Sequence, residues 1–258
     1  MTTRLCTLFA IAAMTTTAPA DETDNRDRFT EHTLAASSGL KLPYRQLAPA
    51  RIVPGQKYPL VIFLHGGGER GSDNQKQLVH GVNEFASDEI RAKYPAFVVA
   101  PQCPEEMRWV EVDWTLDAHQ MPAQPSEPLA ALFELLDHLQ RTQPIDSRRI
   151  YLTGLSMGGF GVWDTIQRRP ELFAAAAPIC GGGDPILAKQ IQFVPLWVFH
   201  GDADETVKVN RSRAMVEAVK GVGTEVKYTE YKGVGHDSWT QTYKDPALYA
   251  WMFSQRRK

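Results

Sequence analysis

The sequence predicts an α/β fold: an eight-stranded, mostly parallel sheet with helices on both faces and no large cap domain. Two observations predict it. Short runs of β-branched and apolar residues alternate along the chain with longer segments of helical periodicity. Most of the short runs are continuously apolar, as expected of strands that are covered on both faces. At 258 residues, of which 43% are hydrophobic, the chain can bury a core of this size as one domain.

The first twenty residues differ from the rest of the chain. Arg4 precedes an apolar run over residues 5–14, and small residues follow, ending in Ala18-Pro19-Ala20. The run is shorter than the roughly 18 residues of a membrane-spanning helix, and the A-x-A ending suits a signal peptidase. We therefore expect a signal peptide over residues 1–20, a folded domain over residues 21–258, and a secreted or periplasmic protein. An uncleaved N-terminal anchor is the alternative.

The predicted strands follow in order. Two alternating segments, 28–34 and 43–48, surround Ser37-Ser38-Gly39 and predict an antiparallel hairpin. The five strands expected next are the continuously apolar runs 60–64, 97–100, 150–152, 174–179 and 196–199. Residues 225–231 are the expected eighth strand.

Helices are predicted between these strands. Leucines recur at helical spacing from 129 to 139 after Pro128, which suits a first helical turn. Further helices are expected over the segments 157–168, 211–220 and 246–255. Residues 104–125 fit neither period and exceed the usual length of a connection, so we expect a functional loop or a small cap there.

Charge and cysteine content exclude several classes of protein. The chain has 28 basic and 30 acidic side chains, so no broad positive field exists for nucleic acid or an anionic membrane. We expect no nucleic-acid partner and no membrane insertion, and the oligomeric state stays open. Cleavage of the signal peptide leaves Cys103 and Cys180, whose spacing matches neither a dense disulfide framework nor a metal site. A bridge between them stays possible in an exported protein.

The segment Gly154-Leu155-Ser156-Met157-Gly158 carries the clearest chemical signal. It directly follows a predicted buried strand and directly precedes a predicted helix. A strand-to-helix turn this sharp leaves the Ser156 hydroxyl exposed at the carboxyl edge of the sheet, and the glycines remove Cβ atoms that would clash. This context predicts a nucleophile elbow. The alternative is a glycine-rich helix entry with an ordinary serine.

A serine nucleophile requires a histidine base with a carboxylate behind it. Two candidate acids, Asp202 and Asp204, follow the strand at 196–199, and His236 lies in a later glycine-rich loop. All three residues follow strand carboxyl ends, where open α/β sheets place their sites. Spacing does not choose between the two aspartates. We expect His65 and His200, which also end strands, to be structural.

A glycine-rich loop follows the first buried strand, in the segment Leu64-His65-Gly66-Gly67-Gly68-Glu69-Arg70-Gly71. Such a loop can bring backbone N–H groups close to an oxyanion. Its glycines also satisfy the dinucleotide pattern G-x-G-x-x-G, but the next strand ends in Pro101-Gln102 instead of a ribose-binding acid. The acidic cluster at 202–205 lacks the other positions of a calcium loop. We therefore expect no cofactor and no metal.

Taken together, these motifs resemble the α/β-hydrolase superfamily, and within it the small bacterial serine esterases of the dienelactone hydrolase, phospholipase/carboxylesterase and prolyl oligopeptidase catalytic-domain group. The likeness covers nearly the whole of residues 21–258, which it identifies as an α/β-hydrolase catalytic domain. It implies catalytic roles for Ser156, Asp204 and His236, and oxyanion donors at Met157 and Gly67, with Gly68 as the alternative donor. Ser156 departs from dienelactone hydrolases proper, which carry a cysteine.

The resemblance also implies a strand order. The strands that precede Cys103 and Cys180 then have two others between them, which at ~4.8 Å per strand exceeds the reach of a disulfide unless the loops converge.

The expected function is that of a serine carboxylic-ester hydrolase that acts through an acyl-enzyme on short-chain esters or on acetylated or feruloylated carbohydrate. Trp109, Trp114 and Trp239 are expected to bind substrate as a partly exposed aromatic wall, or alternatively to pack the loop onto the sheet. A serine peptidase of the prolyl oligopeptidase type is the second enzymatic hypothesis. A non-catalytic binding protein on a hydrolase scaffold is the third.

Overall fold

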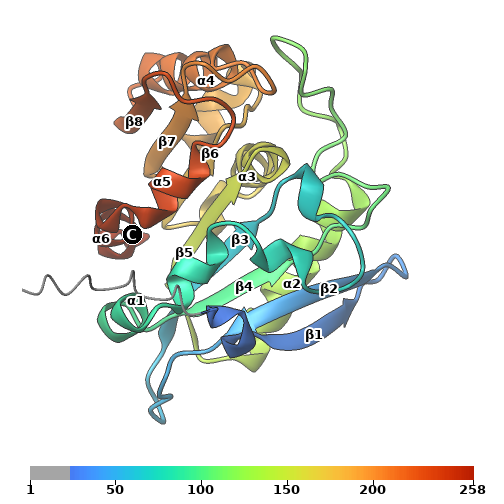
Figure 1. Ribbon diagram of the computed structural model, residues 1–258, viewed down its shortest axis with the longest axis vertical. Coiled ribbons are helices and arrows are strands. Elements are labelled where there is room, and N and C mark those ends of the chain that lie inside the picture. Colours follow the sequence, from blue (N-terminus) through green and yellow to red (C-terminus); the bar gives the residue numbers. More distant parts are fainter. Residues whose placement is uncertain (1–23) are drawn as a thin grey trace, which may run out of the picture.

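A single mixed sheet forms the centre of the computed structural model, which describes residues 24–258 (Figure 1). Its strand order is β1-β2-β4-β3-β5-β6-β7-β8. Strands β1 and β2 are antiparallel, as are β2 and β4, and the other neighbours are parallel. The strands are β1 Thr30–Ala35, β2 Lys41–Leu47, β3 Tyr58–Leu64, β4 Phe97–Pro101, β5 Ile145–Leu155, β6 Ala175–Ile179, β7 Leu196–Gly201 and β8 Val226–Tyr231. The predicted fold class and strands are confirmed.

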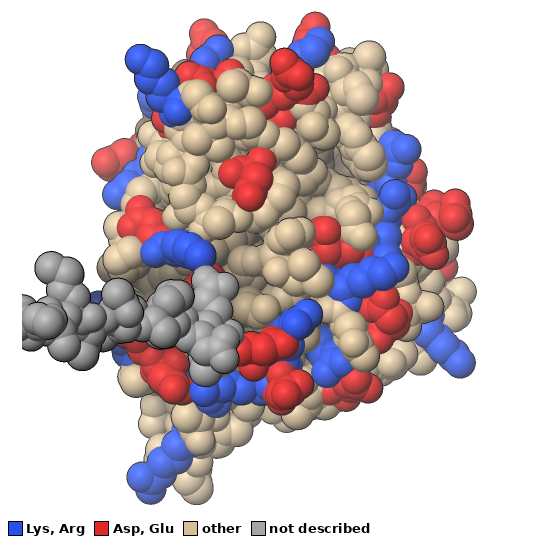
Figure 2. All heavy atoms as spheres, in the orientation of Figure 1, with Lys and Arg blue, Asp and Glu red and all other residues tan. Residues whose placement is uncertain are grey.

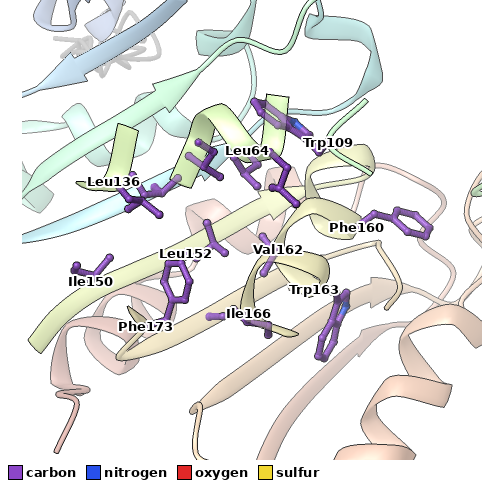
Figure 3. Close-up of a cluster of buried hydrophobic side chains, with 14 of the residues drawn as sticks. Leu64, Trp109, Leu136, Ile150, Leu152, Phe160, Val162, Trp163, Ile166 and Phe173 are labelled. Carbon is purple, nitrogen blue, oxygen red and sulfur yellow. The ribbon is translucent and has the colours of Figure 1, made fainter. Parts of the chain in front are cut away.

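Helices cover both faces of the sheet. They are α1 Asp88–Lys93, α2 Glu127–Thr142, α3 Met157–Arg168, α4 Asn210–Gly221, α5 Trp239–Lys244 and α6 Pro246–Ser254. Alternate residues of β3 divide between two cores: Ile62 belongs to the core that includes residues of α2, α3 and α4, while Phe63 belongs to the core that includes residues of α5 and α6. Figure 3 shows the first of these cores between the sheet and its covering helices. The continuously apolar strands therefore have the two-sided burial that they predicted.

Two short α-helices of the described chain were not predicted, and one segment has no regular structure. Helices α1 and α5 have six residues each, which is too short for an apolar period to stand out. Residues 104–125 form neither helix nor strand and run as an extended loop at the upper right of Figure 1. Charged side chains of both signs are intermixed on the face shown in Figure 2, without a large patch of one sign.

Cys103 and Cys180 are both buried and free. They follow β4 and β6, which are separated by β3 and β5 as the resemblance implied. The predicted signal peptide lies outside the described residues. Within residues 24–258, no helix has the length and apolar character needed to cross a membrane.

Candidate active site

The turn between β5 and α3 holds Ser156 in a strained conformation. Its φ of 54° and ψ of −120° lie where non-glycine residues are rare. Two glycines allow the turn to pack this tightly: a Cβ at Gly154 would lie 2.7 Å from the Leu64 carbonyl oxygen, and one at Gly158 would lie 2.0 Å from the same atom. The Ser156 amide donates to the Ile179 carbonyl over 3.0 Å. The geometry is that of a nucleophile elbow.

His236 connects Ser156 to Asp204 by two short hydrogen bonds. Its Nε2 lies 2.8 Å from the Ser156 Oγ, and its Nδ1 lies 2.7 Å from the Asp204 Oδ2. The ionised carboxylate only accepts, so Nδ1 donates to it and Nε2 is left to accept the serine proton. The His236 side chain is 22% exposed, and that of Asp204 is fully buried. This arrangement lets a neutral imidazole withdraw the proton from the hydroxyl.

Four donors surround the Asp204 carboxylate. Besides His236, His200 approaches to 3.2 Å, and the amides of Thr206 and Val207 donate over 2.9 Å each. Burial on its own raises the pKa of Asp204, but the hydrogen bonds from His200, His236 and Val207 outweigh that effect and hold the pKa well below its usual range. The carboxylate is therefore ionised and fixed in position.

The structure separates the two candidate acids. Asp202 is exposed, and its carboxylate accepts from the Gly233 amide over 2.6 Å. It therefore fastens the loop that carries His236, while Asp204 contacts the imidazole itself. His200 is buried, as expected of a structural histidine, and its Nδ1 lies 2.8 Å from the Ser212 Oγ. Sequence reasoning missed its contact with Asp204, four residues further along the chain.

The glycine-rich loop after β3 passes directly over Ser156. A Cβ at Gly66 would lie 3.6 Å from the Ser156 Cβ. Gly67 begins a short 3-10 helix, Gly67–Glu69, and Met157 begins α3, so the amides of both lie at helix N-termini, where N–H groups lack intrahelical acceptors. Their role as oxyanion donors, which the resemblance implied, stays a prediction.

His65 holds this loop in place. Its Nδ1 donates to the Gly66 carbonyl over 2.7 Å, and its Nε2 accepts from the Cys103 amide over 2.9 Å. Burial lowers the pKa of His65 to about 4, so the imidazole is neutral at pH 7. The prediction that His65 is structural agrees with these contacts.

The three predicted tryptophans differ in position. Trp109 is fully buried, and its Nε1 donates to the His65 carbonyl over 3.1 Å, so it departs from the expected exposed wall and anchors the loop instead. Trp114 is partly exposed; its ring edge lies 4.0 Å from where a Gly67 Cβ would be, and the Arg108 guanidinium covers one face. Trp239 is also partly exposed and meets the His236 ring edge-on at 5.2 Å. Only Trp114 and Trp239 therefore flank the candidate site.

One group of possible metal ligands occurs among the described residues, and it overlaps this site. Cys180, Asp204 and His236 present ligand atoms within 4.8 Å of one another. The Asp204–His236 hydrogen bond already uses two of these groups, and burial raises the pKa of the Cys180 thiol, which disfavours the thiolate that a metal needs. The donor set does not fit a resident metal.

Fold and site together define an α/β-hydrolase with a Ser–His–Asp constellation. The chain belongs to the phospholipase/carboxylesterase family, whose model matches residues 50–247. A crystal structure of a thermostable esterase is similar over 90% of this chain and 64% of that chain, with 40% identity and a TM-score of 0.85. A ferulic acid esterase structure shares the fold, with 20% identity, a TM-score of 0.65, and coverage of 88% of this chain and 98% of that chain.

Two curated relatives are much longer proteins. The bifunctional acetylxylan esterase/xylanase XynS20E of Neocallimastix patriciarum is 26% identical over 162 residues, or 62% of this chain. An uncharacterized secreted protein of Arthroderma benhamiae is 25% identical over 213 residues, or 70% of this chain. The chain spans 21% of the length of each of these two relatives.

Proposed function

We propose that this protein is a serine carboxylesterase that works through an acyl-enzyme. One observation carries the proposal: the Ser156 Oγ, the imidazole of His236 and the carboxylate of Asp204 are joined by hydrogen bonds of 2.8 and 2.7 Å. Membership of the phospholipase/carboxylesterase family supports the same reaction class.

The reaction proceeds in two halves. Ser156 attacks the ester carbonyl while His236 Nε2 takes its proton, and the amides of Gly67 and Met157 donate to the oxyanion. The imidazolium, stabilised by Asp204, then protonates the departing alcohol and leaves an acyl-Ser156 intermediate. Water attacks this intermediate with His236 again as the base. The carboxylic acid is released, and the serine recovers its proton.

The substrates we propose are short-chain esters or acetylated or feruloylated carbohydrate. The partly exposed rings of Trp114 and Trp239 lie beside Gly67 and His236, and aromatic rings suit a sugar or an aromatic acyl group. Similarity to an acetylxylan esterase/xylanase supports the acetyl class. No helix that could serve as a long apolar lid occurs between β4 and α2 in the described chain.

A panel of substrates tests this proposal. Purified protein beginning at residue 21 is assayed against p-nitrophenyl esters from acetyl to palmitoyl, acetylated and feruloylated xylan fragments, and peptide amides, with Ser156→Ala as the blank. We expect hydrolysis of the esters with an optimum at short acyl chains and little cleavage of the amides. A preference for amides indicates the peptidase instead, and an optimum at twelve carbons or longer indicates a lipase.

We also propose that the protein is exported with cleavage after Ala20. The composition of the first twenty residues supports this, as does similarity to a secreted protein. N-terminal sequencing of the protein recovered outside the cytoplasm of a bacterial host should begin at Asp21. Retention in the cytoplasm with an intact Met1 contradicts it.

A further inference from the structure

Arg211, in the first turn of α4, is a buried cation without a direct counter-ion. The residue is 2% exposed, and its Nη2 donates to the His119 Nδ1. Its Nε and Nη1 are buried and have no hydrogen-bond partner, and no carboxylate of residues 24–258 lies within ion-pair distance. Buried charges are normally paired, so unpartnered donors on a buried guanidinium require an explanation.

No nearby carboxylate among the described residues pairs directly with Arg211, although the charges of Asp117 and Asp113 act on it from a distance. Burial and the charge of Arg211 lower the pKa of His119 to about 4, so its imidazole accepts a hydrogen bond but carries no compensating charge. The Asp184 carboxylate accepts instead from the Met121 amide over 2.9 Å and the Ile186 amide over 3.0 Å. The Nε and Nη1 donors of Arg211 therefore stay unsatisfied in the described chain.

Arg211 lies close to the elbow that carries Ser156. Its guanidinium carbon is 5.1 Å from the ring centroid of Phe160, which lies one helical turn after Ser156 on α3. Phe160 is buried and lies at the edge of the cluster drawn in Figure 3. Gly182, after β6, makes room for the cation, because a Cβ there would lie 2.8 Å from the Arg211 Nε. The guanidinium thus lies at the same edge of the sheet as the hydroxyl.

We propose that Arg211 is a specificity-determining residue that recognises a carboxylate on the ester substrate. This inference rests on the proposed esterase function and names its substrate class: esters with a free carboxylate on either the acyl or the alcohol part. A guanidinium presents fixed donors that match a carboxylate. Asp113 and Asp117 lie near enough to influence Arg211, and their charges favour a monoanion over a dianionic phosphate.

One of the contacts that hold the loop beside Arg211 is a surface ion pair. The stretch 113–118, exposed except for the partly buried Trp114, belongs to the loop that carries His119, and an ion pair of 2.7 Å ties Asp117 to Lys208. Both partners are more than half exposed, at 74% and 54%, and such surface pairs contribute little stability. Access of a substrate carboxylate to the guanidinium requires this stretch to move, and the Asp117–Lys208 pair adds little resistance to that movement.

Matched pairs of esters test the inference. The two esters of a pair differ only in that one carries a carboxylate and the other a carboxamide. Monoethyl adipate and ethyl adipamate place the group on the acyl side, and 4-acetoxybenzoate and 4-acetoxybenzamide place it on the alcohol side. We expect the wild-type protein to prefer the carboxylate at least ~10-fold in kcat/KM in one arm, which identifies the side that faces Arg211. Arg211→Gln should lower this ratio about 10- to 100-fold, the usual worth of a charged hydrogen bond.

Two further variants separate recognition from loop anchoring. Lys208→Gln also removes a positive charge that contacts the loop 104–125, at Asp117 instead of His119, and should leave the carboxylate-to-carboxamide ratio unchanged. Arg211→Lys keeps the charge and should keep part of the preference. The inference is wrong if the wild type shows no preference in either arm, a result that stands even if Arg211→Gln fails to fold. It is also wrong if Lys208→Gln lowers the ratio as much as Arg211→Gln. Hydrolysis of the neutral esters without any preference leaves the esterase proposal intact.

Discussion

Asp204 and Arg211 are two buried charges in the segment that follows β7, and their surroundings are opposite. The carboxylate of Asp204 accepts from His236 and two backbone amides, and the His200 Nε2, which is bonded to the Val207 carbonyl, lies 3.2 Å away. The guanidinium of Arg211 has one hydrogen bond and two buried nitrogens without a partner. A fully satisfied polar network is rigid, whereas an incomplete one is costly until a partner arrives. The difference indicates that Asp204 serves catalysis and that Arg211 serves to bind a ligand.

The largest expected effect tests the chemical side of this comparison. Ser156→Ala removes only the attacking oxygen, so kcat/KM on a short-chain ester should fall by about 10⁴-fold or more. The melting temperature should stay close to that of the wild type, because the strained turn is kept. Steady-state kinetics and thermal denaturation of the purified variant check both parts. Substantial turnover by this variant means that Ser156 is not the nucleophile.

The next effect separates the two aspartates. Asp204→Asn should lower kcat by about 10²- to 10⁴-fold, because the amide cannot stabilise the imidazolium form of His236. Asp202→Asn is the matched control, since it changes an exposed carboxylate two residues away, and it should lower kcat only a few-fold. Both are measured on the same short-chain ester. The opposite ranking assigns the acid role to Asp202.

A third prediction concerns stability against pH. The pKa of buried His65 is lowered to about 4, so between the unfolded value of about 6.5 and pH 4 the unfolded chain binds a proton that the folded chain excludes. The free energy of unfolding should therefore fall as the pH drops through this window, by on the order of 3 kcal/mol from this residue. His65→Gln keeps a donor and an acceptor without the titration. Urea unfolding at pH 7 and pH 4 should show a smaller loss for this variant, and an equal loss contradicts the assignment.

The smallest effect on activity is expected at the rim of the site. Trp239→Ala removes an indole that contacts the His236 ring edge-on, and it should reduce the preference for short-chain or acylated carbohydrate esters by several-fold. Trp109→Phe is a useful comparison, because Trp109 is buried away from the rim and its loss should affect stability more than preference. A preference unchanged by Trp239→Ala shows that this indole does not line the substrate site.

Metal removal should have no effect at all. The one possible group of metal ligands in the described chain consists of Cys180, Asp204 and His236. It does not suit a resident metal, because Asp204 and His236 are hydrogen-bonded to each other and the Cys180 thiol is buried. Activity should be the same before and after dialysis against EDTA. Loss of activity that a divalent cation restores contradicts this prediction and indicates a cation site at the acidic cluster 202–205.

Local patterns predicted most of the fold and part of the site. The elbow could be predicted because Ser156 is fixed by its immediate neighbours, a buried strand and two glycines. The choice of Asp204 over Asp202 could not be made from spacing, because it depends on how the loop after β7 packs: a Cβ at Gly201 would lie 2.2 Å from the Val234 carbonyl oxygen. The burial of Trp109 depends on the loop 104–125. This loop follows neither a helical nor a strand period, so its sequence does not predict which of its residues are buried.

Labelling with a fluorophosphonate tests the central claim most directly. The reagent phosphonylates an activated serine with loss of fluoride, so intact-mass measurement and peptide mapping locate the nucleophile without any assumption about the natural substrate. We predict one adduct per chain on Ser156, no adduct in Ser156→Ala, and much slower labelling in Asp204→Asn than in Asp202→Asn. An adduct on another residue, or unlabelled wild-type protein that nevertheless hydrolyses esters, contradicts the assignment of Ser156, His236 and Asp204.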